Sequence, residues 1–442
     1  MPVRPEPTPL AVGESLELNV EKAVYRGQAL ARHEGRVIFV PRAFPGDRVR
    51  VRVASLERGF ARAEMLEILE AARGRRPPPC PHAERCGGCA YQGLGYEEQL
   101  RLKRDILEET LRRAGAPFAG KIELAPSPEE GWRTRASFHF EAHAGTLRLG
   151  LHEEGSHTVV DLERCLQLSP GLNEVARGLK QALDSRRDLW PVLRGLHLAA
   201  GNENGCVASL AVRLPAAEAA QLLSLRSAAP GLTGFAALAG EDDHPAFVML
   251  QGSPRLGHRV LDLRMTAHAR AFFQANRFQV EGLVRAVLEL LPGDGPALDL
   301  YAGVGLFALP LLARGQAVRA VEGDETAVDD ARENARRLGL AGFRIDRGDV
   351  RAALAVLPRE EGEQIVLDPP RTGAGLDVVE LVAARRPRTI VYVSCDPPTL
   401  GRDLAHFAKT GYRADALRAF DMFPDTFHLE TVVRLVPAAA SL

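Results

Sequence analysis

The stretch PALDLYAGVGLFALPLLARG, residues 296–315, is a short apolar run that ends in a glycine turn and continues as a helical stretch. From about residue 280 onward, similar runs alternate with helical stretches, among them EQIVLDPPRTGAG (363–375) and TIVYVSCDPPTLGRDLAHFAKTG (389–411). This alternation predicts a doubly wound α/β sheet, in which ligands bind beyond the carboxyl ends of the strands. The side chains at those ends are therefore the first candidates for a functional site.

Informative residues stand where four of these strands end. The first strand, Ala297–Leu300, leads into Tyr301 and a Gly-x-Gly turn that lets a ligand approach the backbone. The second ends at Glu322, about twenty residues after the first glycine, the spacing of an acid that binds a ribose. The third ends near Asp349 and the fourth at Asp368. Each acid alone is more simply a strand end or helix cap, but their alignment on successive strands favours a cofactor site.

The chemistry of this turn narrows the choice of cofactor. The turn lacks the G-x-G-x-x-G pattern of dinucleotide sites and the Lys-Ser/Thr pair of phosphate loops. S-adenosylmethionine carries a ribose and a sulfonium but no phosphate, so it is the adenosyl cofactor that fits best.

Cys395 stands at the end of a further apolar strand. A lone cysteine is usually a small buried hydrophobe, but at a strand-to-helix corner a helix N-terminus is expected to lower the thiol pKa. Methylation of carbon 5 of a pyrimidine needs a thiolate that adds to carbon 6 and a base that removes the carbon-5 proton. Glu430, just before the last apolar strand, is the candidate base, with His428 as the alternative. Arg371 after Asp368-Pro-Pro disfavours an amino-group methylase, in which an aromatic residue normally stacks on the base.

The length and composition of the chain limit its number of domains and the class of protein to which it belongs. The chain has 442 residues, of which 46% are hydrophobic and 26% charged, and its formal net charge of −1 names no partner. Its length predicts about two to four domains. There is no apolar run of transmembrane length, and the proline-rich start, MPVRPEPTPLAVGE, has no apolar signal core. We therefore expect a cytoplasmic protein that does not enter a membrane.

Residues 13–70 predict a small β-barrel, because several short strands of period two are separated by Gly and Pro turns. From Lys22 to Arg76 there are thirteen Lys or Arg against six Asp or Glu. This local excess makes the segment a candidate surface for a polyanion, although charge alone slightly favours a solvated basic face.

Cysteines crowd just after this segment. Cys80, Cys86 and Cys89 give the spacing C-x5-C-x2-C, and Cys165 is the best candidate for a fourth ligand. Cys206 is interpreted as a buried strand residue. Crowding in a long chain without a signal peptide favours a metal site over disulfides. Four thiolates suit either zinc or an iron–sulfur cluster, and the spacing alone does not decide between them.

Several stretches together resemble a known family. They are ALDLYAGVGLFALPL, VEGDETAVDDARENA, LDPPRTG, YVSCDPPTLGRD, DMFPDTFHLE and AFFQANRFQ, and they look like segments of the S-adenosylmethionine-dependent RNA (uracil-C5)-methyltransferases. The resemblance implies that Cys395 is the nucleophile and Glu430 the proton acceptor. It also implies that five residues hold the cofactor or orient the uracil: Gln274, Tyr301, Glu322, Asp349 and Asp368. Two departures are Asp396, where the family usually has Asn, and Asp425, where His or Gln is more usual.

The same resemblance implies a class I methyltransferase fold, a TRAM-type barrel and a strand-rich central domain. The expected boundaries are 13–72 for the barrel, 78–95 with 121–265 for the central iron–sulfur and RNA-binding domain, and 96–120 with 266–442 for the catalytic domain. Family members with this cysteine motif bind a [4Fe-4S] cluster, with zinc as the alternative here. In the central region Trp132, Arg133, Arg135 and Phe138 mix aromatic and basic residues, and those outside the core are expected to contribute to RNA specificity.

The barrel and the cysteine motif together favour 23S ribosomal RNA as the substrate. A transfer RNA uridine-C5 methyltransferase and a non-catalytic RNA-binding protein with a relic methylase domain are the alternatives. An RNA cytosine-C5 enzyme is disfavoured because Arg371 stands where that class has a cysteine. No protein partner is evident, and a monomer is expected.

Overall fold

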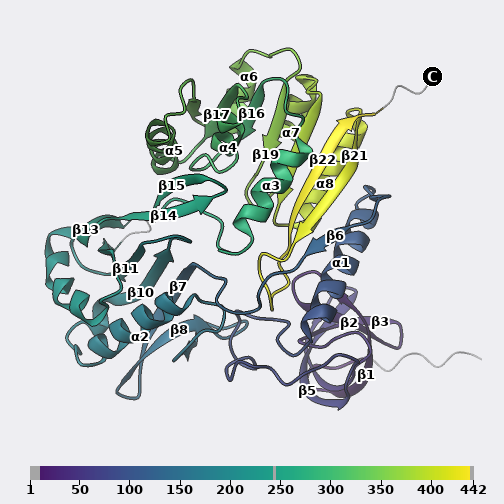
Figure 1. The fold of residues 1–442 in the computed structure, drawn as a ribbon. Helices are drawn as coiled ribbons and strands as arrows, with labels where there is room; N and C mark the ends of the chain where they lie inside the picture. The colour runs from purple at the N-terminus through teal and green to yellow at the C-terminus, as the bar shows by residue number, and fades with distance from the viewer. Residues whose placement is uncertain (1–9, 242–244, 439–442) are drawn as a thin grey trace, which may run out of the picture. The chain divides into compact units, whose positions relative to one another are not determined.

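A computed structural model describes residues 10–241 and 245–438 of the protein (Figure 1). The chain forms two compact units, Met1–Leu107 with Asp425–His428, and Glu108–Pro424 with Leu429–Leu442. The domain boundaries expected from the sequence cut the chain differently and stay a prediction. Within the described ranges, no helix is both long and apolar enough to cross a membrane.

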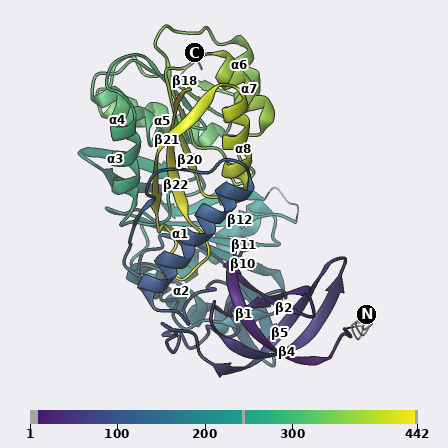
Figure 2. The same ribbon diagram turned by 90° about the vertical axis from the view of Figure 1, so that its right-hand side faces the viewer.

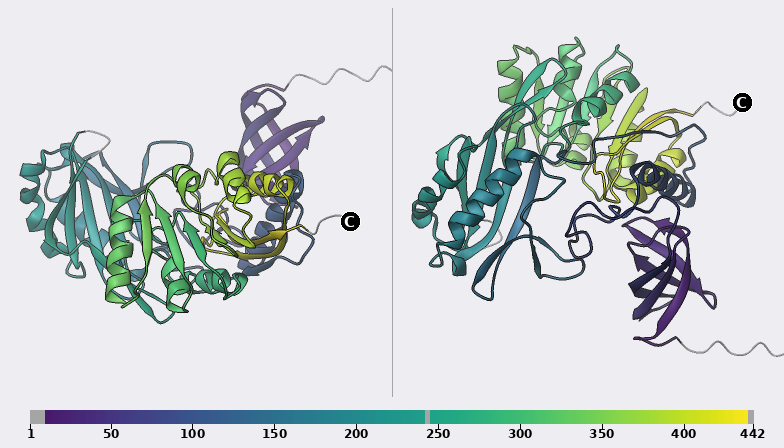
Figure 3. Two further views of the ribbon diagram at one scale, coloured as in Figure 1. Left: turned by 90° about the horizontal axis from the view of Figure 1, so that it is seen from above. Right: turned by 60° about the horizontal axis from the view of Figure 1, so that its bottom comes forward.

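The first unit begins with a closed five-stranded barrel (Figure 3). Its strands, in the order β1-β2-β3-β5-β4, are β1 (Ser15–Val24), β2 (Gln28–His33), β3 (Arg36–Pro41), β4 (Arg48–Glu57) and β5 (Phe60–Glu70). On β4 the valines point into the barrel and the arginines point out, as the alternation predicts. The arginines pair with glutamates of β1 and β5: Arg48 with Glu70 at 2.6 Å, and Arg50 with Glu67 at 2.5 Å and Glu17 at 3.2 Å. The β4 arginines are therefore not the source of the positive excess expected to bind a polyanion.

The cysteine loop joins the barrel to α1 (Tyr96–Arg113). Arg75, at its start, forms a buried ion pair with Asp47 at 2.7 Å. Segment 425–428 belongs to the same unit, because the Asp425 carbonyl accepts hydrogen bonds from the backbone of Ala90 and Tyr91, both at 2.9 Å. The side chain of Asp425, noted above as a departure from the family, accepts a hydrogen bond from Gln99 Nε2 of α1 at 2.9 Å.

The second unit contains a seven-stranded sheet in the order β13-β12-β11-β10-β7-β8-β9. Its strands are β7 (Arg135–His143), β8 (Thr146–His152), β9 (Val159–Asp161), β10 (Leu193–Ala200), β11 (Cys206–Val212), β12 (Gly234–Ala239) and β13 (Ala246–Gly252). Helices α2 (Pro170–Asp184) and η2 (Ala216–Ala228) pack on one face, and η1 (Trp190–Val192) leads into β10. Phe138 is 4% exposed in this core, and Trp132 is fully buried against Phe423. Both aromatic residues are therefore core residues, and only Arg133 and Arg135 remain candidates for RNA contact.

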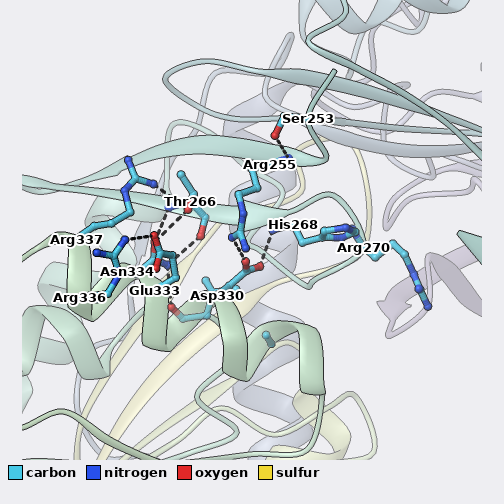
Figure 4. A network of polar contacts seen from close by, with 12 residues as sticks. Ser253, Arg255, Thr266, His268, Arg270, Asp330, Glu333, Asn334, Arg336 and Arg337 are labelled. Carbon is cyan, nitrogen blue, oxygen red and sulfur yellow. Dashed lines mark hydrogen bonds and ion pairs between the residues drawn. The ribbon is translucent and has the colours of Figure 1, made fainter. Parts of the chain in front are cut away.

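A hairpin, β14 (Arg255–Val260) and β15 (Leu263–His268), joins this region to the catalytic sheet. Figure 4 shows that side chains of α5 (Glu325–Arg337), among them Asp330 and Asn334, point toward it. The buried Asp330 carboxylate accepts hydrogen bonds from Arg255 and from the His268 backbone at 2.6 Å, and Asn334 Oδ1 accepts one from the Thr266 backbone at 2.8 Å. These bonds fix the hairpin to the helix that follows the Glu322 strand.

The catalytic sheet has eight strands in the order β18-β17-β16-β19-β20-β22-β21-β6. They are β16 (Ala297–Leu300), β17 (Val318–Glu322), β18 (Arg344–Arg347), β19 (Gln364–Leu367), β20 (Thr389–Ser394), β21 (Tyr412–Phe420), β22 (Glu430–Pro437) and β6 (Glu123–Ala125). The first five are parallel to one another, and β22 runs antiparallel between β20 and β21. Strand β21 therefore has the same direction as the first five, and β6 pairs parallel with it and covers its edge. Residues 123–125, expected in the central domain, thus belong to this sheet.

Helices cover both faces of this sheet (Figure 2). One side carries α3 (Val280–Leu290), α4 (Ala308–Ala313) and α5, and the other carries α6 (Val350–Val356), α7 (Leu376–Ala384) and α8 (Pro397–Lys409). The doubly wound fold predicted from residue 280 onward is confirmed.

Candidate active site

The sheet brings the predicted residues to a single edge. Because β17, β16, β19 and β20 are parallel neighbours, their carboxyl ends lie side by side. Glu322, Tyr301, Asp368 and Cys395 stand at these ends in that order. Glu430 opens β22, which runs antiparallel to β20 and so starts at the same edge.

The first turn is held in a conformation that needs glycine. Gly303 and Gly305 have φ of 54° and 88°, and Tyr301 adopts φ of 64°, which is uncommon for a residue with a side chain. Glu322 braces the turn, since its carboxylate accepts the Gly303 N–H and the Asp324 N–H, both at 2.8 Å. The acid expected to bind a ribose is therefore oriented by the backbone on both sides.

Asp299, inside β16, is an acid to which the sequence reasoning gave no role. Its side chain is fully buried, and although it lies near the Ala308 N–H it makes no hydrogen bond of normal geometry. Burial, and then the nearby Asp368, raise its pKa well above the ordinary value. The signal was an acid within the apolar run ALDL. A buried carboxyl beside Asp368 and Glu322 suits a positively charged ligand, and S-adenosylmethionine carries a sulfonium and an ammonium.

Cys395 and Glu430 lie within electrostatic reach of each other. Burial, followed by Glu430, raises the pKa of Cys395 to about 12, while Arg371 acts in the opposite direction. Glu430 is 2% exposed, and burial and then Asp368 raise its pKa well above the usual range. Asp368 has a pKa raised to about 7 by burial and by Glu322. The expected lowering of the Cys395 pKa is therefore wrong for the protein without ligands, because burial and neighbouring acids outweigh the helix N-terminus.

Asp396, the unusual neighbour of Cys395, is engaged by the following helix. It is the N-cap of α8, and its Oδ1 accepts the backbone N–H and the hydroxyl of Thr399, both at 3.0 Å. It is the last and smallest contributor to the raised Cys395 pKa. The side chain thus points into the helix rather than toward the thiol.

The loop 368–375 is tied to the strand and helix that flank Cys395. The fully buried Asp403 carboxylate accepts hydrogen bonds from Tyr392 Oη at 2.7 Å, the Ala374 N–H at 2.9 Å and Arg402 Nε at 2.8 Å. Tyr392 lies on β20 and Asp403 on α8, so one carboxylate joins three segments of the site.

Further contacts hold the same loop close to α8. Arg402 donates to the Thr372 carbonyl at 2.9 Å, and Thr399 donates to the Arg371 carbonyl at 3.3 Å. Gly373 has φ of 76°, and a Cβ there would come within 2.6 Å of the Arg402 and Asp403 side chains. The backbone that carries Arg371 is therefore closely fixed.

Three predicted residues remain, Asp349, Gln274 and His428, and their surroundings do not by themselves assign them a role in the reaction. Asp349 caps α6, its Oδ1 accepting the Ala352 N–H at 2.9 Å, yet it also contributes to the raised pKa of Tyr301. Gln274 is 4% exposed on the segment between β15 and α3. Two residues earlier, Phe272 is 69% exposed, a solvent-facing aromatic ring that sequence reasoning did not single out. His428, the alternative base, belongs to segment 425–428 and packs against Phe427.

The metal site is not brought together by the structure. Cys80, Cys86 and Cys89 lie in the first unit and Cys165 in the second. Across residues 10–241 and 245–438, no three His, Cys, Asp or Glu side chains are grouped so as to hold a metal ion. The metal site thus stays a prediction. Cys206 lies at the start of β11, which confirms its interpretation as a strand residue, but it is half-buried rather than buried. This partial burial raises its pKa to about 12.

This fold and this edge of buried acids define a class I methyltransferase. Residues 255–437 match the family model described as tRNA (Uracil-5-)-methyltransferase, and residues 9–66 match the TRAM domain. An uncharacterized RNA methyltransferase of Streptomyces avermitilis is 36% identical, over 98% of this chain and 100% of the relative. The 23S rRNA (uracil(1939)-C(5))-methyltransferase of Halomonas elongata is 35% identical, over 95% of this chain and 89% of the relative.

A solved structure supports the same assignment. The tRNA (uracil-54, C5)-methyltransferase of Pyrococcus abyssi, in complex with S-adenosyl-L-homocysteine, is 25% identical, with a TM-score of 0.76 over 95% of this chain and 100% of that chain. The chain belongs to the S-adenosylmethionine-dependent RNA (uracil-C5)-methyltransferases, and its barrel is a TRAM domain.

Proposed function

We propose that the protein methylates carbon 5 of an accessible uridine in 23S ribosomal RNA. The observation that carries this proposal is the placement of Cys395 and Glu430 at one edge, where β20 pairs with β22 and Glu430 lies within electrostatic reach of the Cys395 thiol. The similarity to the Halomonas elongata enzyme supports ribosomal RNA over transfer RNA. A relic domain is disfavoured, because the thiol, the acids and Arg371 all occupy this edge.

The reaction we propose uses Cys395 as the nucleophile. Its thiol proton leaves to solvent, and Arg371 stabilises the thiolate. Sγ forms a bond to carbon 6 of uracil, and the carbon 5–carbon 6 π electrons shift toward carbon 5 and O4. S-adenosylmethionine supplies the methyl group, which carbon 5 takes as the sulfonium sulfur keeps the electron pair of the broken bond. Glu430 then takes the carbon-5 proton, the double bond re-forms, and the bond from Sγ to carbon 6 breaks to return the thiolate.

The cofactor is held, in this proposal, by five side chains of the edge and its surroundings. Glu322 would accept hydrogen bonds from the ribose, and Asp299 and Asp368 would face the positive end of the cofactor. Tyr301, before the glycine turn, and Asp349, within its electrostatic reach at the start of α6, would also contact the cofactor. Gln274 and Phe272 would contact the uracil. The raised pKa values of the buried acids support this arrangement, because a cation relieves their mutual repulsion.

We also propose that Cys80, Cys86, Cys89 and Cys165 bind a [4Fe-4S] cluster rather than zinc. The support is the spacing of the first three cysteines within ten residues. Reconstitution with iron and sulfide should give a visible absorption band that Cys89→Ser loses and Cys206→Ser keeps. Binding of zinc alone, with no such band, would exclude the iron–sulfur cluster.

The test of the substrate is the identity of the product. The protein is incubated with a labelled methyl donor and either a protein-free 23S ribosomal transcript or a transfer RNA transcript, and the nucleosides are separated. The proposal expects 5-methyluridine in the 23S transcript only. Label in 5-methylcytidine, or in transfer RNA alone, would contradict it. We further propose a cytoplasmic monomer, for which gel filtration should give the mass of one chain.

A further inference from the structure

A recess of about 390 Å³ lies on the seven-stranded sheet. We call this recess the sheet pocket. Six residues form its polar and charged lining: Arg133, Arg135, Ser137, His197, Ser209 and Arg270. Helices α2 and η2 pack on one face of this sheet, and these β7, β10 and β11 side chains lie on the other. The pocket shares no lining residue with the edge that carries Cys395 and Glu430.

The three polar side chains form a row across neighbouring strands. His197 of β10 is the register partner of Ser137 on β7 and of Ser209 on β11. Ser137 Oγ lies 2.9 Å from His197 Nδ1. When the hydroxyl donates this bond, the neutral ring carries its proton on Nε2 and can donate to a ligand. Small residues such as Ala199 complete the wall. A recess that combines small side chains with a few convergent donors and acceptors suits a planar, polar-edged base.

The three arginines give the pocket an uncompensated positive charge. Arg133 donates to the Arg135 carbonyl at 2.8 Å, and Arg135 donates to the carbonyls of Ala269 and Ala271. The exposed Arg270 lies over the Phe247 ring at 5.9 Å. Among the residues that the structure describes, none of the three pairs with a carboxylate, in contrast to the arginines of β4. Guanidinium groups without acidic partners favour a phosphate ligand.

Aromatic rings continue the same surface beyond the pocket. His139, two residues from Ser137 on the same face of β7, stacks on His152 with ring centroids 3.9 Å apart, and His157 meets His152 edge-on at 5.6 Å. His139 also lies within electrostatic reach of His197. Flat rings beside cations form the kind of surface that binds single-stranded RNA, in which bases stack and phosphates meet positive charge.

We propose that the sheet pocket holds a second, unpaired nucleobase of the RNA substrate, with the adjoining phosphates bound by Arg133 and Arg270. A recess of this size admits one base but not a paired helix, so the partner is a single-stranded segment. This inference rests on the proposed function, in which RNA is the substrate. The second base, held in the sheet pocket, would fix the position of the RNA strand that carries the target uridine.

The test uses the full-length protein with Arg270→Ala and His197→Ala combined. Both side chains are exposed, so the fold should be unaffected. Matched controls are Arg264→Ala, an exposed arginine of β15 that pairs with Glu203, and His143→Ala at the end of β7. The probes are a fluorescent single-stranded oligoribonucleotide, its duplex with the complementary strand, and uridine monophosphate.

The double variant should bind the single strand about tenfold more weakly, with the duplex unaffected. Its KM for a 23S transcript should rise by a similar factor while kcat stays within about twofold, and the controls should match the wild type. The proposal would be overturned if the double variant bound the single strand as tightly as the wild type does. It would also be overturned if the affinities for single strand and duplex fell equally, or if only the affinity for uridine monophosphate fell. Failure of the proposed function would be seen separately, as a wild type that forms no 5-methyluridine.

Discussion

Asp403 offers a sharp test of how the active-site loop is held. Its buried carboxylate accepts three hydrogen bonds, two at Oδ2 from Tyr392 and Ala374, and one at Oδ1 from Arg402. In Asp403→Asn the amide oxygen can keep the first two bonds, but the amide NH2 then faces the Arg402 donor. One charge-assisted bond is lost and two become neutral, which should cost about 3 kcal/mol of unfolding free energy.

Thermal unfolding is the first assay for this variant. A loss of about 3 kcal/mol corresponds to a fall in Tm of about 4 °C for a unit of about 330 residues. Tyr392→Phe removes the hydroxyl that donates to Asp403 and accepts the Ala374 N–H at 3.0 Å, but it keeps the Asp403 carboxylate and that carboxylate's own bond from Ala374. It should therefore lower Tm by less than Asp403→Asn does.

Single-turnover methylation is the second assay. Because the loop carries Asp368 and Arg371, its loosening should slow the chemical step of Asp403→Asn about tenfold or more at saturating cofactor and RNA. A variant as stable as the wild type would show that the three bonds do not hold the loop. A destabilised variant with an unchanged chemical rate would show that the loop position does not matter for catalysis.

Other changes at the same edge have defined outcomes. Glu430→Gln should accumulate a covalent enzyme–RNA adduct on ordinary uridine RNA, seen as a shifted band in a denaturing gel, because no base removes the carbon-5 proton; turnover at the wild-type rate would remove Glu430 from the mechanism. Asp368 has a folded pKa raised to about 7 from an ordinary 3.8, so the stability it contributes is present below about pH 4 and is lost as pH rises through 7. Asp368→Asn without cofactor should therefore have a higher Tm than the wild type at about pH 8 but not at about pH 4, and equal Tm values at both pH values would contradict the raised pKa. Asp299→Asn should weaken cofactor binding about tenfold, measured by calorimetry, because an amide cannot become the carboxylate that would face the bound cation; unchanged affinity would exclude that role.

Much of the catalytic domain could be predicted from local sequence. Short apolar strands that alternate with helices predict the doubly wound sheet. Because ligands bind at the carboxyl ends of its parallel strands, the positions of the strand ends predict that Glu322, Asp368 and Cys395 lie at one edge. Asp299 was missed because it lies inside the strand pattern, where an acid has no obvious role until its burial and its neighbours are known.

Properties that depend on three-dimensional neighbours could not be predicted. The Cys395 pKa is set by burial and by Glu430, which lies 35 positions along the chain, rather than by its own helix. Alternation on β4 correctly predicts that the arginines share a face, but not that glutamates of two other strands neutralise them. Trp132 and Phe138 are core residues because of helix α2 and other distant segments, which the local pattern does not reveal.

The most direct test of the central claim is to identify the residue that attaches to RNA. With 5-fluorouridine RNA and S-adenosylmethionine, carbon 5 carries fluorine in place of the proton that Glu430 would remove, so the covalent adduct should persist. After digestion, mass spectrometry should find the methylated nucleotide on Cys395, and Cys395→Ala should form no adduct. An adduct on another residue, or one that survives in Cys395→Ala, would contradict the assignment of Cys395 as the nucleophile.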